Sequence, residues 1–198
     1  MDKEKLAKNL TAHGFTPHFF ATKEEAADFL LASVQNTTVG IGGSVTIDQM
    51  DVYDRLCEKN EVFWHWKKAD PDTRTKAALA HVYLSSANGI SETGEIVNID
   101  GRGNRVIGTL CGPEIVYILA GRNKVAPTLD AALDRARNIA APLNARRLNR
   151  KTPCAVGEPK CHDCSSPDRI CNGFTVISHR MTGMSEYHIV LIDEELGY

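Results

Sequence analysis

Four cysteines near the C-terminus have a spacing that could hold a metal. The pattern Cys-x6-Cys-x2-Cys-x6-Cys places four thiols within 18 residues, at Cys154, Cys161, Cys164 and Cys171. The close pair brings two thiolates to one centre, and the longer arms let two more fold back. Zinc would take all four tetrahedrally, and a [4Fe-4S] cluster would use the same ligands. The spacing is standard for neither, so a cluster, zinc and metal-free thiols all stay open. The remaining Cys57 and Cys111 are expected to be buried, inert thiols.

A glycine-containing turn has the composition of an anion site. Gly42, Gly43 and Ser44 follow an apolar stretch, and Thr46 with Gln49 forms the pattern of a capping box at a helix start. Glycines let the backbone approach a ligand closely. Free amides and hydroxyls at a helix start favour an anion. The alternative is a tight turn in which Thr46 serves only as the cap, and both interpretations stay open.

A second small, polar loop runs from Ser85 to Gly94 after another apolar stretch. Loops beyond the carboxyl ends of strands in α/β sheets commonly hold ligands. Asn88 and Thr93 are therefore candidate ligand contacts, and Glu92 is the candidate catalytic carboxylate. The alternative for Glu92 is an ordinary turn residue. If the two preceding strands are parallel neighbours, both loops meet at one edge, and Glu92 stands across from the bound anion.

The elements that must position these loops alternate between helix and strand patterns. Helices are predicted over residues 3–13, after a capping box at 22–25, from Thr46 to about Cys57, and from Thr128 to Ala140. Pro142 is expected to kink the last helix or to begin a new one. Strands are predicted over 15–20, 38–41, 62–66, 82–86, 95–99, 105–110, 115–120, 174–178 and 187–192. The turn at 100–104 predicts a hairpin between 95–99 and 105–110. The pattern indicates an α/β fold with a mixed sheet, in one domain over 1–198 with a cysteine-rich loop at 151–172.

Composition narrows the function classes. The chain has 198 residues, 42% hydrophobic and 24% charged, which is typical of one folded domain. A net charge of −2 argues against a nucleic-acid partner. The longest uncharged stretch, 29–47, is broken by polar residues and glycines, so no membrane span is expected. No secretory signal is visible, which predicts the cytoplasm. Residues 135–151 hold six basic and no acidic residues, suited to balancing a metal centre or binding an anionic substrate.

Three segments together resemble a known family. Residues 42–44, 89–95 and 141–147 have the order and spacing of the LUD-domain (lactate-utilisation) family, and are most similar to its stand-alone LutC/YkgG-like proteins. The resemblance extends from about Lys3 to Tyr198. It implies a Rossmann-like fold related to sugar-phosphate isomerases and CoA transferases, with a ligand crevice at the strand ends.

The resemblance also implies a function. The expected role is the oxidation of lactate or a related 2-hydroxy acid, beside an iron–sulfur partner subunit and with a small anionic substrate. Members that carry the cysteine-rich insert belong to pathways rich in iron–sulfur chemistry, which favours a cluster. The other function left open is an anion- or CoA-type binding or regulatory protein whose metal site is only structural. Turnover by this chain itself and a homo-oligomeric state are left open in both cases.

Overall fold

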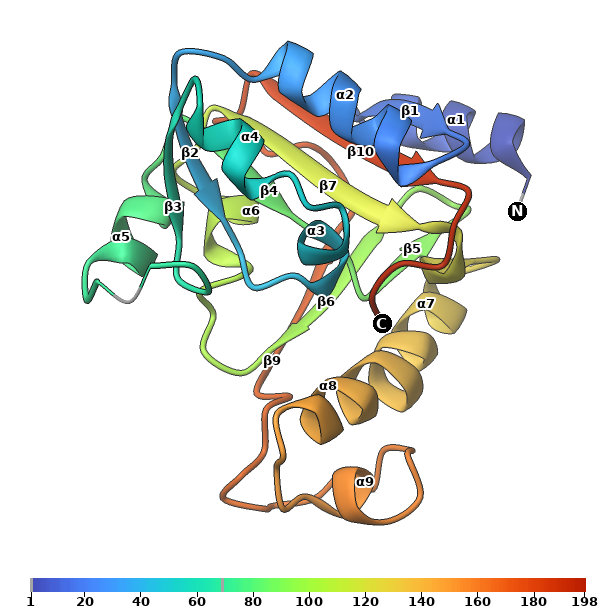
Figure 1. Ribbon diagram of the computed structural model, residues 1–198. Helices are drawn as coiled ribbons and strands as arrows, with labels where there is room; N and C mark the ends of the chain where they lie inside the picture. Colours follow the sequence, from blue (N-terminus) through green and yellow to red (C-terminus); the bar gives the residue numbers. More distant parts are fainter. Residues whose placement is uncertain (1, 69) are drawn as a thin grey trace.

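A parallel sheet forms the centre of the molecule. The computed structural model describes residues 2–68 and 70–198. Six parallel strands lie in the order β1 (Thr16–Phe20), β10 (Glu186–Ile192), β7 (Ile115–Gly121), β4 (Val82–Ser85), β2 (Thr38–Ile41) and β3 (Glu61–Trp64) (Figure 1). The predicted α/β class is confirmed.

Both faces of this sheet are buried, which explains why its strands are nearly continuous apolar runs. Tyr117 and Leu119 of β7 belong to the core cluster that includes α2 (Lys23–Ser33), α3 (Val45–Gln49) and α4 (Tyr53–Cys57). Val116 and Ile118 belong to the opposite cluster, with α1 (Lys3–Ala12) and part of a second sheet. At Gly40 of β2 a Cβ would lie 1.9 Å from the carbonyl oxygen of Ala77, so glycine is needed there for α5 (Thr73–Ala78) to contact the sheet.

The second sheet contains the antiparallel pairs. Its order is β8 (Val125–Ala126), β5 (Gly89–Ser91), β6 (Ile96–Asp100) and β9 (Gly173–Ile177). The predicted hairpin between 95–99 and 105–110 is wrong, because β6 pairs with β5 and β9 instead. The Asp100 carboxylate accepts a hydrogen bond from the Arg105 amide at 2.9 Å, which folds 100–105 into a compact loop. Residues 107–110 then form a short helix, α6 (Ile107–Leu110).

Two of the predicted helices differ in detail from the structure. The helix expected from Thr46 to Cys57 is two short helices, α3 and α4, separated at Asp51, whose φ is 51°. Thr128 caps α7 (Leu129–Arg135) as predicted, with its hydroxyl accepting from the Ala131 amide. The chain continues through a π-helical segment, η2 (Ala136–Ala140), into α8 (Ala141–Arg147). Because Pro142 has no amide hydrogen, the ordinary α-helical bond is lost at this position.

The cysteine-rich segment, residues 151–172, extends away from the sheet beside α8 (Figure 1). It contains one short helix, α9 (Pro153–Val156). Arg146 of α8 donates to the carbonyls of Ala155 and Gly157, at 3.1 and 2.9 Å, and the Asn138 side chain accepts from the Cys161 amide at 3.0 Å. None of the helices in the described ranges is long and apolar enough to cross a membrane.

Candidate functional site

The two predicted loops meet at one edge of the parallel sheet. β2 and β4 are parallel neighbours, the condition under which both loops meet, with Gly40 opposite Tyr83. The Gly42 amide extends the pairing by donating to the carbonyl of Leu84 at 2.9 Å. Beyond the strand ends, Ser44 from one loop and Asn88 from the other line a cavity of about 580 Å³. Its place at the carboxyl edge of the strands is the usual one for ligands in α/β folds.

Positive charge dominates the walls of this cavity. Among the described residues that line it, seven are basic and two are acidic. The acidic residues are Asp100 and Asp168, and the basic residues come from several separate segments: Arg74, Arg102, Arg105, Lys124, Arg147, Arg150 and Arg169. His65 also lines the cavity, and its pKa is lowered by burial and then by Arg74 and Arg102. An anion would relieve the repulsion among these cations.

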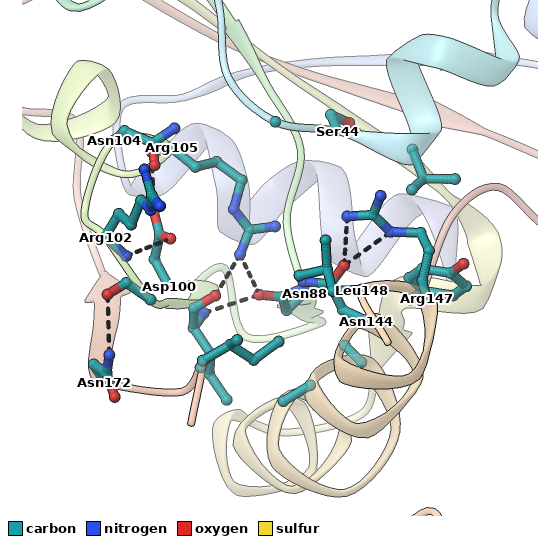
Figure 2. A pocket seen from close by; sticks show the side chains of 18 of the residues that line it. Ser44, Asn88, Asp100, Arg102, Asn104, Arg105, Asn144, Arg147, Leu148 and Asn172 are labelled. Carbon is teal, nitrogen blue, oxygen red and sulfur yellow. Dashed lines mark hydrogen bonds between the residues drawn. The ribbon is translucent and has the colours of Figure 1, made fainter. Parts of the chain in front are cut away.

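Asn88 orients the most constrained of the arginines. Its side-chain oxygen accepts from the Arg105 guanidinium and from the Ile99 amide, both at 2.8 Å (Figure 2). The same guanidinium nitrogen also donates to the Ile99 carbonyl. Burial lowers the pKa of Arg105. Asn88 is therefore a positioning residue that holds a desolvated cation at the cavity.

The two glycines of the first loop have different roles. A Cβ at Gly42 would lie 2.9 Å from the Tyr83 hydroxyl and 3.1 Å from Cγ of Arg105, so glycine is required there by close contacts. A Cβ at Gly43 would touch the Trp66 indole at 3.4 Å, an ordinary contact. Trp66 stacks on Trp64 with centroids 5.6 Å apart, and Arg147 lies 5.0 Å above the Trp66 ring. Gly43 thus leaves one part of an indole open to the cavity.

The capping role predicted for Thr46 is wrong. Ser44 is the N-cap of α3, with its hydroxyl accepting from the Ile47 amide at 3.2 Å. Because α3 has only five residues, its amides do not make an anion site by themselves. The Thr46 side chain is buried instead, in contact with Ser86 and Lys124.

Glu92 and Thr93 do not line the cavity. β5 carries the chain away from the cavity, so that Asn88 lies at its near end and Glu92 at its far end. The Glu92 carboxylate accepts from the Asp2 amide at 3.0 Å and lies 3.5 Å from Nζ of Lys5. The Thr93 hydroxyl contacts the Glu95 carboxylate at 2.5 Å. The expected position of Glu92 across from the anion is therefore not observed.

The four clustered cysteines are all partly exposed. Cys154 Sγ lies 3.3 Å from the Thr152 hydroxyl, and Arg169 donates to the carbonyls of Cys164 and Cys171, at 2.6 and 3.1 Å. Thiolates suit zinc or a cluster chemically. Within residues 2–68 and 70–198, however, no group of three His, Cys, Asp or Glu side chains is placed to hold a metal ion.

The other two cysteines correct a second expectation. Cys57 and Cys111 are exposed, not buried. Cys57 ends α4, whose buried residue is the preceding Leu56, and Cys111 directly follows α6. A short helix buries only one side, and Cys57 falls on the other, whereas Cys111 follows its helix in extended backbone.

Several residues that line the cavity were not among the candidates identified from the sequence. Arg102 and Arg105 had been placed in a hairpin, and Lys124 lies just beyond the apolar strand at 115–120, where a third ligand loop could have been sought. Arg169 reaches the cavity from the cysteine-rich segment, which forms one of its walls. Of the basic run at 135–151, Arg147 and Arg150 line the cavity, whereas Arg146 holds the cysteine-rich segment.

Fold and cavity define an α/β protein with a cation-lined cavity at the carboxyl edge of a parallel sheet. The family model for the LUD domain matches residues 3–192, and the chain therefore belongs to the LUD-domain family. The crystal structure of a DUF162 family protein from Deinococcus radiodurans is similar, with a TM-score of 0.57 over 96% of this chain and 95% of that chain. At 11% identity, this likeness shows the fold alone. No curated protein matches the chain.

Proposed function

We propose that this LUD-domain protein binds a small organic anion in the cavity and takes part in oxidising lactate or a related 2-hydroxy acid. The observation that carries the proposal is the excess of basic over acidic side chains around the cavity in the described chain. Arginine suits carboxylate and phosphate groups because its planar fork donates two parallel hydrogen bonds. Family membership supports the choice of a 2-hydroxy acid as the substrate class.

The redox part of the proposal concerns the cysteines and a partner. A 2-hydroxy acid loses two electrons on oxidation, which an iron–sulfur partner subunit would accept. The four clustered thiols supply the donor chemistry for a [4Fe-4S] cluster or for zinc. This part is supported by the family resemblance and by the chemistry of thiol ligands. It does not rest on the positions of the thiols, which are not grouped for ligation in the described residues.

The alternative function is a binding or regulatory protein for a CoA-type anion. Two observations favour it. The cavity, at about 580 Å³, lies in the usual range of sites for drug-sized ligands and exceeds what a three-carbon acid needs. The Trp66 indole lines the cavity beside Gly43, and an aromatic base could stack on it in place of the Arg147 guanidinium.

Calorimetric titration with lactate, pyruvate, phosphate and acetyl-CoA tests the proposal. Arg147 is exposed, and its guanidinium donates to Asn144 of the same helix and covers Trp66, so Arg147→Gln should keep the fold. We expect it to weaken binding about tenfold, as for a lost charge-assisted hydrogen bond. Arg55→Gln, at an exposed ion pair outside the cavity, is the matched control. Equal affinity in both variants contradicts the anion site, and binding of acetyl-CoA alone favours the alternative.

A further inference from the structure

A buried lysine lies at the base of the cavity with two hydroxyl groups. Lys124 is 3% exposed, and its Nζ lies 2.8 Å from the Thr46 hydroxyl and 2.9 Å from the Ser86 hydroxyl. The Ser86 hydroxyl donates to the Leu119 carbonyl at 2.6 Å, and the Thr46 hydroxyl donates to the Leu196 carbonyl at 3.3 Å. Because each hydroxyl has one hydrogen and uses it on a carbonyl, both accept from the lysine.

This arrangement suits an unprotonated amine. A neutral amine has two hydrogens and one lone pair, so donation to Thr46 and Ser86 uses both hydrogens and leaves the lone pair free. In the described part of the chain no carboxylate is paired with Lys124, and the charged groups that act on it are Arg105 and Arg135. Burial, followed by these two cations, lowers the pKa of Lys124 well below its ordinary value. A desolvated lysine beside other cations is a recognised form of activated amine nucleophile.

We propose that Lys124 attacks the carbonyl carbon of a 2-oxo acid in the cavity and forms a reversible Schiff base with it. This inference rests on the proposed function, since oxidation of a 2-hydroxy acid yields a 2-oxo acid. The arginines hold the carboxylate, and the neighbouring carbonyl carbon meets the amine. The Nζ lone pair forms the C–N bond, and the carbonyl oxygen leaves as water with the two amine hydrogens. The step is a condensation and needs no oxidant or reductant.

The hydroxyl pair explains how the protons would move. Thr46 and Ser86 each contact Nζ, and their oxygens lie 3.3 Å apart. To relay a proton, each hydroxyl would take one amine hydrogen and turn its own hydrogen from the backbone carbonyl toward the departing oxygen. If Lys124 were a protonated lysine with only a structural role, its buried charge would need a carboxylate partner, and two hydroxyls would not replace one.

Reductive trapping tests the proposal on the full chain. The protein is incubated with pyruvate and sodium cyanoborohydride, and the adduct is located by peptide mapping. We expect Lys124 to be labelled about tenfold faster than Lys67, an exposed lysine paired with Asp48, because a lowered pKa supplies more free amine. Lactate has no keto group and should label nothing. Lys124→Arg keeps a long side chain with nitrogen donors but has no nucleophilic amine, so it should abolish the adduct, whereas Lys67→Arg should retain it.

The outcomes separate this inference from the proposed function. The peptide map of the wild-type protein tests the Schiff base even if Lys124→Arg does not fold. Labelling of Lys124 no faster than that of Lys67 overturns the Schiff base. If calorimetry in the same preparation still shows anion binding that depends on Arg147, the proposed anion site survives that failure. If no anion binds, yet Lys124 is labelled selectively, the reverse holds: the amine is activated and the arginine site is wrong.

Discussion

Replacing Asn88 by aspartate would add a negative charge at the cavity with almost no change in shape. The Asn88 oxygen accepts from Arg105 and from the Ile99 amide, both at 2.8 Å, and a carboxylate oxygen accepts both equally well. The new charge would lie between Arg105 and Arg135, which donates to the backbone carbonyl of residue 88. We therefore expect Asn88→Asp to fold, with a melting temperature no lower than that of the wild type.

The expected loss of binding follows from the geometry. A ligand oxygen bonded to another nitrogen of the Arg105 guanidinium would lie about 5–6 Å from the new carboxylate. At an effective dielectric constant of about 20, two like charges at that separation repel by about 3 kcal/mol. That energy corresponds to about a hundredfold in Kd. Screening by salt in the open cavity reduces the effect, so we expect a loss of about tenfold to about a hundredfold.

The assay is calorimetric titration of the anion that the wild type binds. Asn36→Asp is the matched control, because Asn36 is exposed, has a φ of 56° that aspartate tolerates, and precedes β2 at the opposite edge of the sheet. It makes the same change in net charge and should bind as the wild type does. Wild-type affinity in Asn88→Asp would show that Arg105 does not hold the anion. Equal losses in both variants would point to net charge alone.

Three further predictions concern other parts of the molecule. Cys161→Ser should lower the zinc or iron content of anaerobically purified protein, since metal binding and local folding are coupled; full occupancy in serine variants of all four clustered cysteines would refute the metal site. Burial, and then His188, lower the pKa of His18, so the folded state should lose stability as the pH falls below about 6.5; chemical unfolding between pH 5 and 8 should show a slope that His18→Gln reduces. Gly43→Val should fold, because its Cβ meets Trp66 only at 3.4 Å, but should weaken anion binding in calorimetry by covering the indole; unchanged affinity would remove Gly43 from the site.

The edge of the sheet at which the cavity lies could be predicted from the sequence. Two apolar stretches followed by small polar loops indicated two strands with ligand loops, and the structure meets the stated condition that these strands, β2 and β4, are parallel neighbours. Local chemistry was enough here, because each loop directly follows its strand. Asn88 and Ser44 reach the cavity for the same reason.

The rest of the site depends on pairings between distant residues. β6 pairs with β9, whose partner residues Ile96 and Ile177 are far apart in sequence, and a local turn signal suggested a hairpin instead. That error hid Arg105, whose position follows from contacts with Asn88 and Asp100. Glu92 was expected at the cavity because it shares a loop sequence with Asn88, but three residues of β5 separate them in space.

The π-helical segment η2 sets the direction in which α8 presents its side chains. Each residue of an α-helix turns the chain by about 100°, and a π turn holds one residue more than an α turn. Removing one residue from η2 would therefore rotate the following turns of α8 by about a quarter of a revolution relative to α7. Asn144 and Arg147, which line the cavity, would then point along its wall. A single-codon deletion within residues 136–139, outside the cavity, would thus change its charge while leaving every residue that lines it in the sequence.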